Sequence, residues 1–298
     1  MPRVITPDLL EAAFKGFKTS FQKGFSGSAP LYTSLATVIT STAREETYSW
    51  LGDMPQMREW IGDRRINQLS AKGYSIRNRK FEMTVGVERD DIEDDSLGLY
   101  STRFEMMGQS AGTHPDRILF EAINGSFSAL CHDGQSFFDT DHPVGPEGAS
   151  VSVSNMQAGA GEPWILVDFS RPLKPWIFQK RRDYNFTRKE DPNTSDHVFL
   201  RDQYLYGVDA RVAAGYGFWQ MAFGSKAELN SANLRAAYTA MSNFTDDEGR
   251  PLGVTPTHVI VGNGNFFKAR DLLIPAQIGG TSNIDQNLVE IIKAPLLR

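Results

Sequence analysis

The chain has 298 residues, of which 40% are hydrophobic and 22% charged, as expected for a globular protein of one large domain or two ordinary ones. A formal charge of −5 argues against a dedicated nucleic-acid-binding protein, because such a domain is usually basic overall. Cys131 is the only cysteine, which excludes an intrachain disulfide and a cysteine zinc site and fits synthesis in the cytosol, and no apolar run is long enough to cross a bilayer.

The first predicted element is an amphipathic helix that begins at Thr6 and Pro7. Its apolar face carries Leu10, Phe14, Phe17 and Phe21. A helix lying on a membrane surface has a similar pattern, but Asp8 and Glu11 make the polar face mixed rather than basic. We therefore expect this helix to dock on a neighbouring subunit, with Phe14 and Phe17 in the contact, before a Gly/Ser/Pro linker over residues 24–30.

Two strand-like segments, residues 66–71 and 74–87, are joined by Lys72 and Gly73 and predict a β-hairpin. Basic residues gather on and around it: Arg64, Arg65, Lys72, Arg77, Arg79 and Lys80. Acidic residues follow at once: Glu88, Asp90, Asp91, Glu93, Asp94 and Asp95. Blocks of opposite charge can steer one copy of a protein onto the next, although a solvated surface is the commoner meaning of a charge run.

A long helix is predicted over residues 96–124. Its apolar stripe consists of Leu97, Tyr100, Phe104, Met107 and Ala111. Gly108, Gly112 and Pro115 predict a kink or break near the middle, and Asn124 and Gly125 predict the end.

The second half of the chain mixes strands and helices, which predicts an α+β fold. The strand-like segments are residues 164–169, 175–179, 197–201, 204–219 and 258–261. Helices are predicted over residues 229–244 and 266–273.

One cluster of possible metal ligands stands out, formed by His132, Asp133, Asp139, Asp141 and His142. The same stretch has the composition of a turn, in which Asp side chains cap backbone N–H groups, and this is the favoured interpretation. Cys131 is expected to be a buried, inert thiol. The segment from Val261 to Gly264 resembles a dinucleotide-binding loop, but Phe267 replaces the third glycine. The sequence thus predicts no catalytic residue, no metal site and no cofactor.

Several strings carry a family resemblance: WLGDMPQMREWIGDR from residue 50, FFDTDHP from residue 137, RPLKPWIFQ from residue 171 and YGVDAR from residue 206. They resemble the major head subunit of Mu-like phages. The order of the predicted elements, from arm through hairpin to long helix and mixed remainder, resembles the HK97-like major capsid fold of tailed bacteriophages.

The resemblance implies an N-terminal arm and anchor (residues 1–63), an extended hairpin loop (64–90), a peripheral domain with a spine helix (91–200, helix 96–124) and a mainly axial domain (201–298). The placement of the strands over residues 164–219 between the last two domains stays open. Many copies would form the hexamers and pentamers of an icosahedral shell that encloses double-stranded DNA.

The implied partners are further copies of the chain, a separate scaffolding protein, a portal and a decoration protein, with only non-specific contact to DNA and none to a membrane. Such a protein would assemble in the bacterial cytoplasm, reside in the virion capsid and not be an enzyme. We expect Arg77, Arg79 and Lys80 of one copy to face acidic residues of another, namely Asp90, Asp91, Asp94 or Asp95. The alternatives are a cargo-enclosing nanocompartment of the same fold and a metalloenzyme that uses the cluster from Asp139 to His142.

Overall fold

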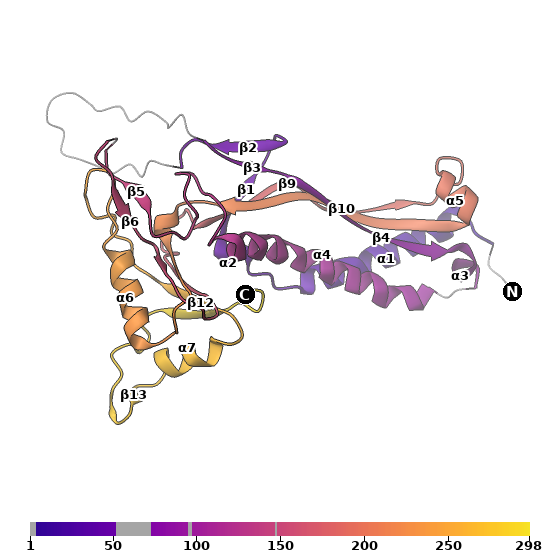
Figure 1. Cartoon of the computed structure of the whole chain (residues 1–298). Coiled ribbons are helices and arrows are strands. Elements are labelled where there is room, and N and C mark those ends of the chain that lie inside the picture. Colours follow the sequence, from indigo (N-terminus) through magenta and orange to yellow (C-terminus); the bar gives the residue numbers. More distant parts are fainter. Residues whose placement is uncertain (1–3, 52–72, 95–96, 147) are drawn as a thin grey trace.

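The computed structural model describes residues 4–51, 73–94, 97–146 and 148–298. Its longest feature is a four-stranded sheet in the order β1-β9-β10-β4, which runs the length of an extended arm (Figure 1). The strands are β1 (Ala36–Thr40), β9 (Trp176–Lys189), β10 (Gln203–Tyr216) and β4 (Arg79–Glu88). β1 is parallel to β9, and the other two pairings are antiparallel. The expected strands near residues 175 and 204 are confirmed, and both are longer than a typical strand of five or six residues.

Two long helices, α1 (Pro7–Gly27) and α4 (Leu97–Gly125), lie along the arm (Figure 1). Thr6 caps α1 as predicted, since its hydroxyl oxygen accepts a hydrogen bond from the N–H of Leu9 at 3.2 Å. The linker prediction is wrong at its start, because α1 continues through Gly24 to Gly27. A Cβ on Gly24 would lie 1.9 Å from the carbonyl oxygen of Glu105, so this glycine lets the two helices pack closely.

The spine helix α4 has the predicted length, but the predicted break is wrong. It continues through Gly108, Gly112 and Pro115 as a single helix. Gly108 and Gly112 instead face α1, where a Cβ on Gly108 would lie 2.0 Å from the carbonyl oxygen of Phe21. Packing against α1 thus explains why these glycines stand in a helix that they would otherwise destabilise.

A second sheet, in the order β15-β12-β8-β11-β7, forms the core of a separate lobe at one end of the arm (Figure 1). Its strands are β15 (Glu290–Lys293), β12 (His258–Val261), β8 (Trp164–Val167), β11 (Ala222–Ser225) and β7 (Met156–Gln157). The lobe also carries the two predicted helices, α6 (Ser231–Ser242) and α7 (Phe266–Leu273). The uncertain strands therefore divide between the sheets: β8 lies in the lobe, whereas β9 and β10 form the arm.

The remaining elements are short. They are α2 (Tyr32–Leu35), β2 (Glu45–Tyr48), β3 (Tyr74–Arg77), α3 (Arg89–Glu93), β5 (His142–Val144), β6 (Val151–Val153), α5 (Asp196–Arg201), the 3-10 turn η1 (Trp219–Met221), β13 (Gln277–Ile278) and β14 (Thr281–Ser282).

Two of these short elements bear on the predictions: β3 leaves the predicted hairpin untested, and α5 corrects a predicted strand. The described partner of β3 is β2, and the predicted partner segment 66–71 lies outside the described residues. Residues 197–201, expected to be a strand, form most of α5, which ends at Asp202 in the left-handed conformation with φ of 49°. Only Val198 of this helix is buried, so its apolar residues do not follow the alternation of a half-buried strand.

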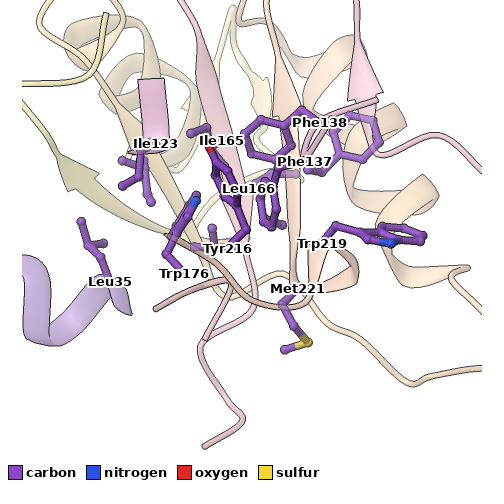
Figure 2. Close-up of a cluster of buried hydrophobic side chains, with 14 of the residues drawn as sticks. Leu35, Ile123, Phe137, Phe138, Ile165, Leu166, Trp176, Tyr216, Trp219 and Met221 are labelled. Atoms are coloured by element: carbon purple, nitrogen blue, oxygen red, sulfur yellow. The ribbon is translucent and has the colours of Figure 1, made fainter. Parts of the chain in front are cut away.

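Buried apolar side chains form two clusters. The larger one joins the lobe to the near end of the arm and contains Trp164, Trp176 and Trp219. Figure 2 shows part of it, with Trp176, Tyr216 and Phe137 beside one another. The smaller cluster lies between α1, α4 and the far half of the long sheet. Across the described residues no helix has both the length and the apolar character to cross a bilayer.

Candidate interaction surfaces

The apolar face of α1 is used within the chain. Phe17 is only 2% exposed and packs against Phe104 of α4, with ring centroids 4.4 Å apart, and against Tyr206 of β10 at 5.1 Å. Phe14 stacks on Phe186 at 5.8 Å and is covered by the guanidinium of Arg188 at 4.2 Å. The expectation that Phe17 contacts a neighbouring subunit is therefore corrected, because its ring is already enclosed by its own chain. Phe14, which is only partly buried, keeps that role as a prediction.

The predicted basic residues fall into three groups. Arg64, Arg65 and Lys72 lie outside the described residues. Arg79 has a carboxylate partner in its own chain, since both oxygens of Glu121 accept hydrogen bonds from its guanidinium at 2.9 and 3.0 Å.

Arg77 and Lys80 form the third group. Both are exposed, and neither has a carboxylate partner among the residues that the structure describes. The two remain candidates for a contact with another molecule.

The predicted acidic residues divide in the same way. Asp95 lies outside the described residues, and Asp91 accepts a hydrogen bond from the hydroxyl of Tyr100. Asp90 and Asp94 are exposed, and no described side chain pairs with either carboxylate. The N–H of Asp94 donates to the carbonyl oxygen of Asp90 at 2.8 Å, so the two residues lie one helical turn apart.

Arg211, which was not predicted as a contact residue, lies on β10 in the middle of the long sheet. Its Cα is paired with that of Lys80 on β4 and that of Arg182 on β9. The Nε atom of Arg211 is buried and has no hydrogen-bond partner. Only the strand register brings these three cations together, and the register cannot be read from residues so far apart in sequence.

Large apolar side chains are exposed at several places on the surface. Leu99 and Met106, two turns apart on α4, are 79% and 66% exposed. Phe199 and Leu200 on α5 and Phe267 on α7 are exposed to a similar degree. Single exposed apolar side chains are normal on protein surfaces, and only a large contiguous patch indicates an interface, so these residues alone do not identify one.

The predicted metal ligands form a smaller, buried cluster. The thiol of Cys131 and the backbone N–H of Gln135 both donate to Oδ1 of Asp133 at 3.0 Å, and Nδ1 of His142 lies 2.6 Å from its Oδ2. The His142 ring is fully buried and stacks on Trp219 with centroids 4.0 Å apart. The structure therefore brings together Cys131, Asp133 and His142.

The other predicted ligands do not join this cluster. Asp139 accepts hydrogen bonds from the backbone of Ser136 and Thr140, as the turn interpretation predicted, and Asp141 accepts one from Ser152. His132 has a buried Nδ1 atom without a partner.

The distances in the cluster of Cys131, Asp133 and His142 are those of hydrogen bonds and not those between ligands of a metal ion. A separation of 2.6 Å between Nδ1 of His142 and Oδ2 of Asp133 is that of a charge-assisted hydrogen bond, whereas two ligands of one zinc ion lie farther apart. Burial, and next the nearby Asp133 carboxylate, raise the pKa of the Cys131 thiol, which disfavours the thiolate that a metal requires. The arrangement is therefore that of a buried structural network.

The surface is also hollowed beside the start of α7. This cleft of about 480 Å³ is lined by a glycine-rich segment, residues 159–161, and by Glu162, Lys226 and Lys268. Glu162 accepts a hydrogen bond from the N–H of Gly264 at 3.3 Å. The described lining contains no histidine, cysteine or serine, so it offers no nucleophile paired with a base.

Comparison with known proteins gives a consistent result across nearly the whole chain. The family model of the Mu-like prophage major head subunit gpT matches residues 10–297. The major capsid protein of Escherichia phage Mu is 42% identical over 280 residues, which cover 91% of this chain and 90% of the relative.

Two solved structures of phage shells are similar to this fold. A chain of the procapsid of bacteriophage JBD30 superposes with a TM-score of 0.86 at 42% identity and covers 98% of this chain and 100% of its own length. A chain of the JBD30 capsid decorated with minor capsid protein trimers has a TM-score of 0.77 at 32% identity, with coverage of 99% and 100%.

Proposed function

Since the chain belongs to the Mu-like prophage major head subunit gpT family, we propose that it is the major capsid protein of a Mu-like bacteriophage. The observation that carries this function is the match to the JBD30 procapsid chain over 98% of the residues, because it includes both the arm and the lobe. The protein then acts by forming a shell, with the HK97-like α+β fold, and not by catalysis.

The shell is proposed to be icosahedral, built from hexamers and pentamers, and to enclose double-stranded DNA. An elongated arm attached to a compact lobe suits this role, because the two parts can each contact different neighbours (Figure 1). We propose that the lobe forms most of the axial domain and the arm most of the peripheral domain. β10 pairs with β9 in the arm, so the proposed boundary near residue 200 is better drawn after β10.

The proposed partners are a scaffolding protein, a portal and a decoration protein. The decorated JBD30 capsid, which carries minor capsid protein trimers, supports the last of these. Contact with packaged DNA is proposed to be non-specific, and assembly to take place in the host cytoplasm. A net charge of −5 agrees with the absence of a dedicated DNA-binding role.

The proposed contact between copies is electrostatic. Arg77 and Lys80 are the described basic residues that remain available, and Asp90 and Asp94 are the available acids. Arg79 contributes less than the sequence suggested, because Glu121 already neutralises it. Complementary charges of this kind would fix the register of neighbouring subunits.

Negative-stain electron microscopy of the chain, expressed with and without its neighbouring genes, tests the function. Closed shells or capsomer rings are expected in at least one condition. A monomer or small dimer under every condition would contradict the proposal, and a co-purifying cargo protein would favour a nanocompartment instead.

Reversing the charges of Arg77, Arg79 and Lys80 together is expected to block shell formation while the subunit stays folded. The matched control exchanges Arg and Lys at the same three positions, which conserves charge. Normal shells from the reversed variant would exclude an electrostatic contact at this site.

A further inference from the structure

Arg211 occupies an unusual position for a charged residue. It lies in a central strand, its side chain is half-buried, and its Nε atom is buried without a partner. Within the described residues no carboxylate or carbonyl oxygen accepts a hydrogen bond from its guanidinium. A buried donor left unsatisfied costs roughly 1–3 kcal/mol, and more when it is charged.

The neighbours of Arg211 increase this cost. Lys80 and Arg182 lie directly opposite it on the two adjacent strands, and like charges at such positions repel. Arg182 is neutralised by Asp209, with which it forms an ion pair. Arg211 and Lys80 remain, so two adjacent cations on this face have no anionic partner among the described residues.

The face in question points away from the helices. Alternate residues of β10, including Val208, Ala210 and Val212, are buried, whereas Asp209 and Arg211 are only half-buried. Arg79, the neighbour of Lys80, points to the other side and pairs with Glu121 of α4. On the side of the sheet opposite α4, Lys80 is therefore exposed and Arg211 is half-buried.

We propose that Lys80 and Arg211 form a docking site for the Asp90 and Asp94 carboxylates of a second copy of this chain. The inference rests on the proposed function, since it assigns a contact between shell subunits. Asp90 and Asp94 lie one helical turn apart, which places their Cβ atoms about 5–6 Å apart. Residues directly opposite on paired strands have Cβ atoms about 4.5–5.5 Å apart, so the two pairs match in spacing as well as in charge.

The same chain cannot make this contact. The acidic pair follows directly after β4, which ends at Glu88, and Lys80 lies near the other end of that strand. The strand advances about 3.3 Å per residue, so roughly 30 Å separates Lys80 from the start of α3 at Arg89. Glu82 and Asp209 lie on the same face, but Thr84 donates to Glu82 and Arg182 pairs with Asp209, so no described carboxylate pairs with Lys80 or Arg211.

Cysteine cross-linking between two differently marked chains tests the contact directly. Chains carrying Lys80→Cys are mixed with chains carrying Asp94→Cys, assembled into shells and treated with a short bismaleimide. Covalent dimers are expected in the mixture and not in either chain alone, because the native Cys131 is buried. Arg79→Cys mixed with Asp94→Cys is the matched control and should give at least fivefold fewer dimers.

The outcomes separate the two levels of the proposal. Shells that form from the mixture without dimers above the control overturn the docking site and leave the shell function intact. Failure of the wild-type chain to form shells under any condition overturns the function itself.

A charge exchange provides a second test. Lys80→Glu with Arg211→Glu, and separately Asp90→Lys with Asp94→Lys, should each lower the shell yield at least tenfold, and a chain that carries all four substitutions should restore it. If the first variant gives normal shells that no longer retain DNA, the site binds nucleic acid and the proposal is wrong.

Discussion

His142 and Asp133 form a hydrogen bond in the protein interior, with Nδ1 of the buried ring 2.6 Å from Oδ2 of the partly buried carboxylate. The other ring nitrogen, Nε2, lies 3.1 Å from Oδ1 of Asn155. That oxygen also accepts the backbone N–H of Asp139, while the Asn155 amide nitrogen donates to carbonyl oxygens, so the orientation of the amide is fixed. Each ring nitrogen thus faces an acceptor oxygen.

Removing one member of this pair should strongly destabilise the subunit. His142→Gln is expected to lower the free energy of unfolding by about 1–3 kcal/mol, because it leaves the partly buried carboxylate without the ring that hydrogen-bonds to it. Urea unfolding of the unassembled subunit measures the loss. Asp141→Asn is the control: this nearby carboxylate is exposed and should change the stability by less than about 0.5 kcal/mol. Equal effects of the two substitutions would contradict a stabilising hydrogen bond between His142 and Asp133.

The same pair predicts how stability depends on pH. Burial alone would raise the pKa of Asp133, but hydrogen bonds from His142, Cys131 and the Gln135 N–H outweigh it and hold the pKa at about 2. A carboxyl whose pKa is depressed by folding stabilises the protein above its unfolded value near 3.8, and this stabilisation is lost as the pH falls through the folded value. The contribution is about 2 kcal/mol.

Comparison of wild type with Asp133→Asn checks this dependence. The difference in unfolding free energy should be constant above about pH 4 and shrink as the pH falls toward 2. A difference that stays constant down to pH 2 would mean that another group carries the pH dependence.

A single methyl group should separate α1 from α4. In Gly108→Ala, the new Cβ would lie 2.0 Å from the carbonyl oxygen of Phe21, so the helices must move apart at a cost of roughly 1–3 kcal/mol. Gly16→Ala, in α1, meets nothing within 4 Å and should stabilise by about 0.5–1 kcal/mol. Thermal unfolding should therefore shift in opposite directions for the two variants, and a stabilising Gly108→Ala would show that this packing is wrong.

The sequence predicted elements whose signals are local. Thr6 and Pro7 indicate the start of α1, and the apolar stripe that includes Phe104 and Met107 indicates α4. The same local reasoning misread Gly108, because a glycine in a helix indicates either a break or a close contact. Only the position of α1, about eighty residues earlier in the chain, decides between these possibilities.

The interaction surfaces were harder to predict, because they depend on pairings between distant residues. Lys80 and Asp90 could be chosen from the charge runs alone. Arg211 could not, since it becomes notable only when β10 is aligned with β4 and β9. Phe17 was assigned to a neighbouring subunit because an amphipathic helix shows that one face is covered but not which molecule covers it.

The thiol of Cys131 should be unreactive in the folded protein. It is 6% exposed, and burial followed by the Asp133 charge raises its pKa, so little of the reactive thiolate exists at neutral pH. Labelling with a chromogenic disulfide should be at least a hundredfold slower in buffer than in 6 M guanidinium chloride. Labelling at the denatured rate in buffer would contradict the buried network around Asp133.

Arg79 and Arg211 should respond differently to the loss of their charge. Arg79 and Glu121 are 52% and 59% exposed, and an ion pair this accessible contributes at most about 1 kcal/mol. Arg79→Ala should therefore fold normally and give wild-type shell yields.

Arg211→Ala removes an unsatisfied cation, so the isolated subunit should keep or gain stability, whereas the shell yield should fall. Measuring both quantities for both variants distinguishes a residue that serves the fold from one that serves the contact between copies. A loss of subunit stability in Arg211→Ala with unchanged shell yield would place Arg211 in the fold.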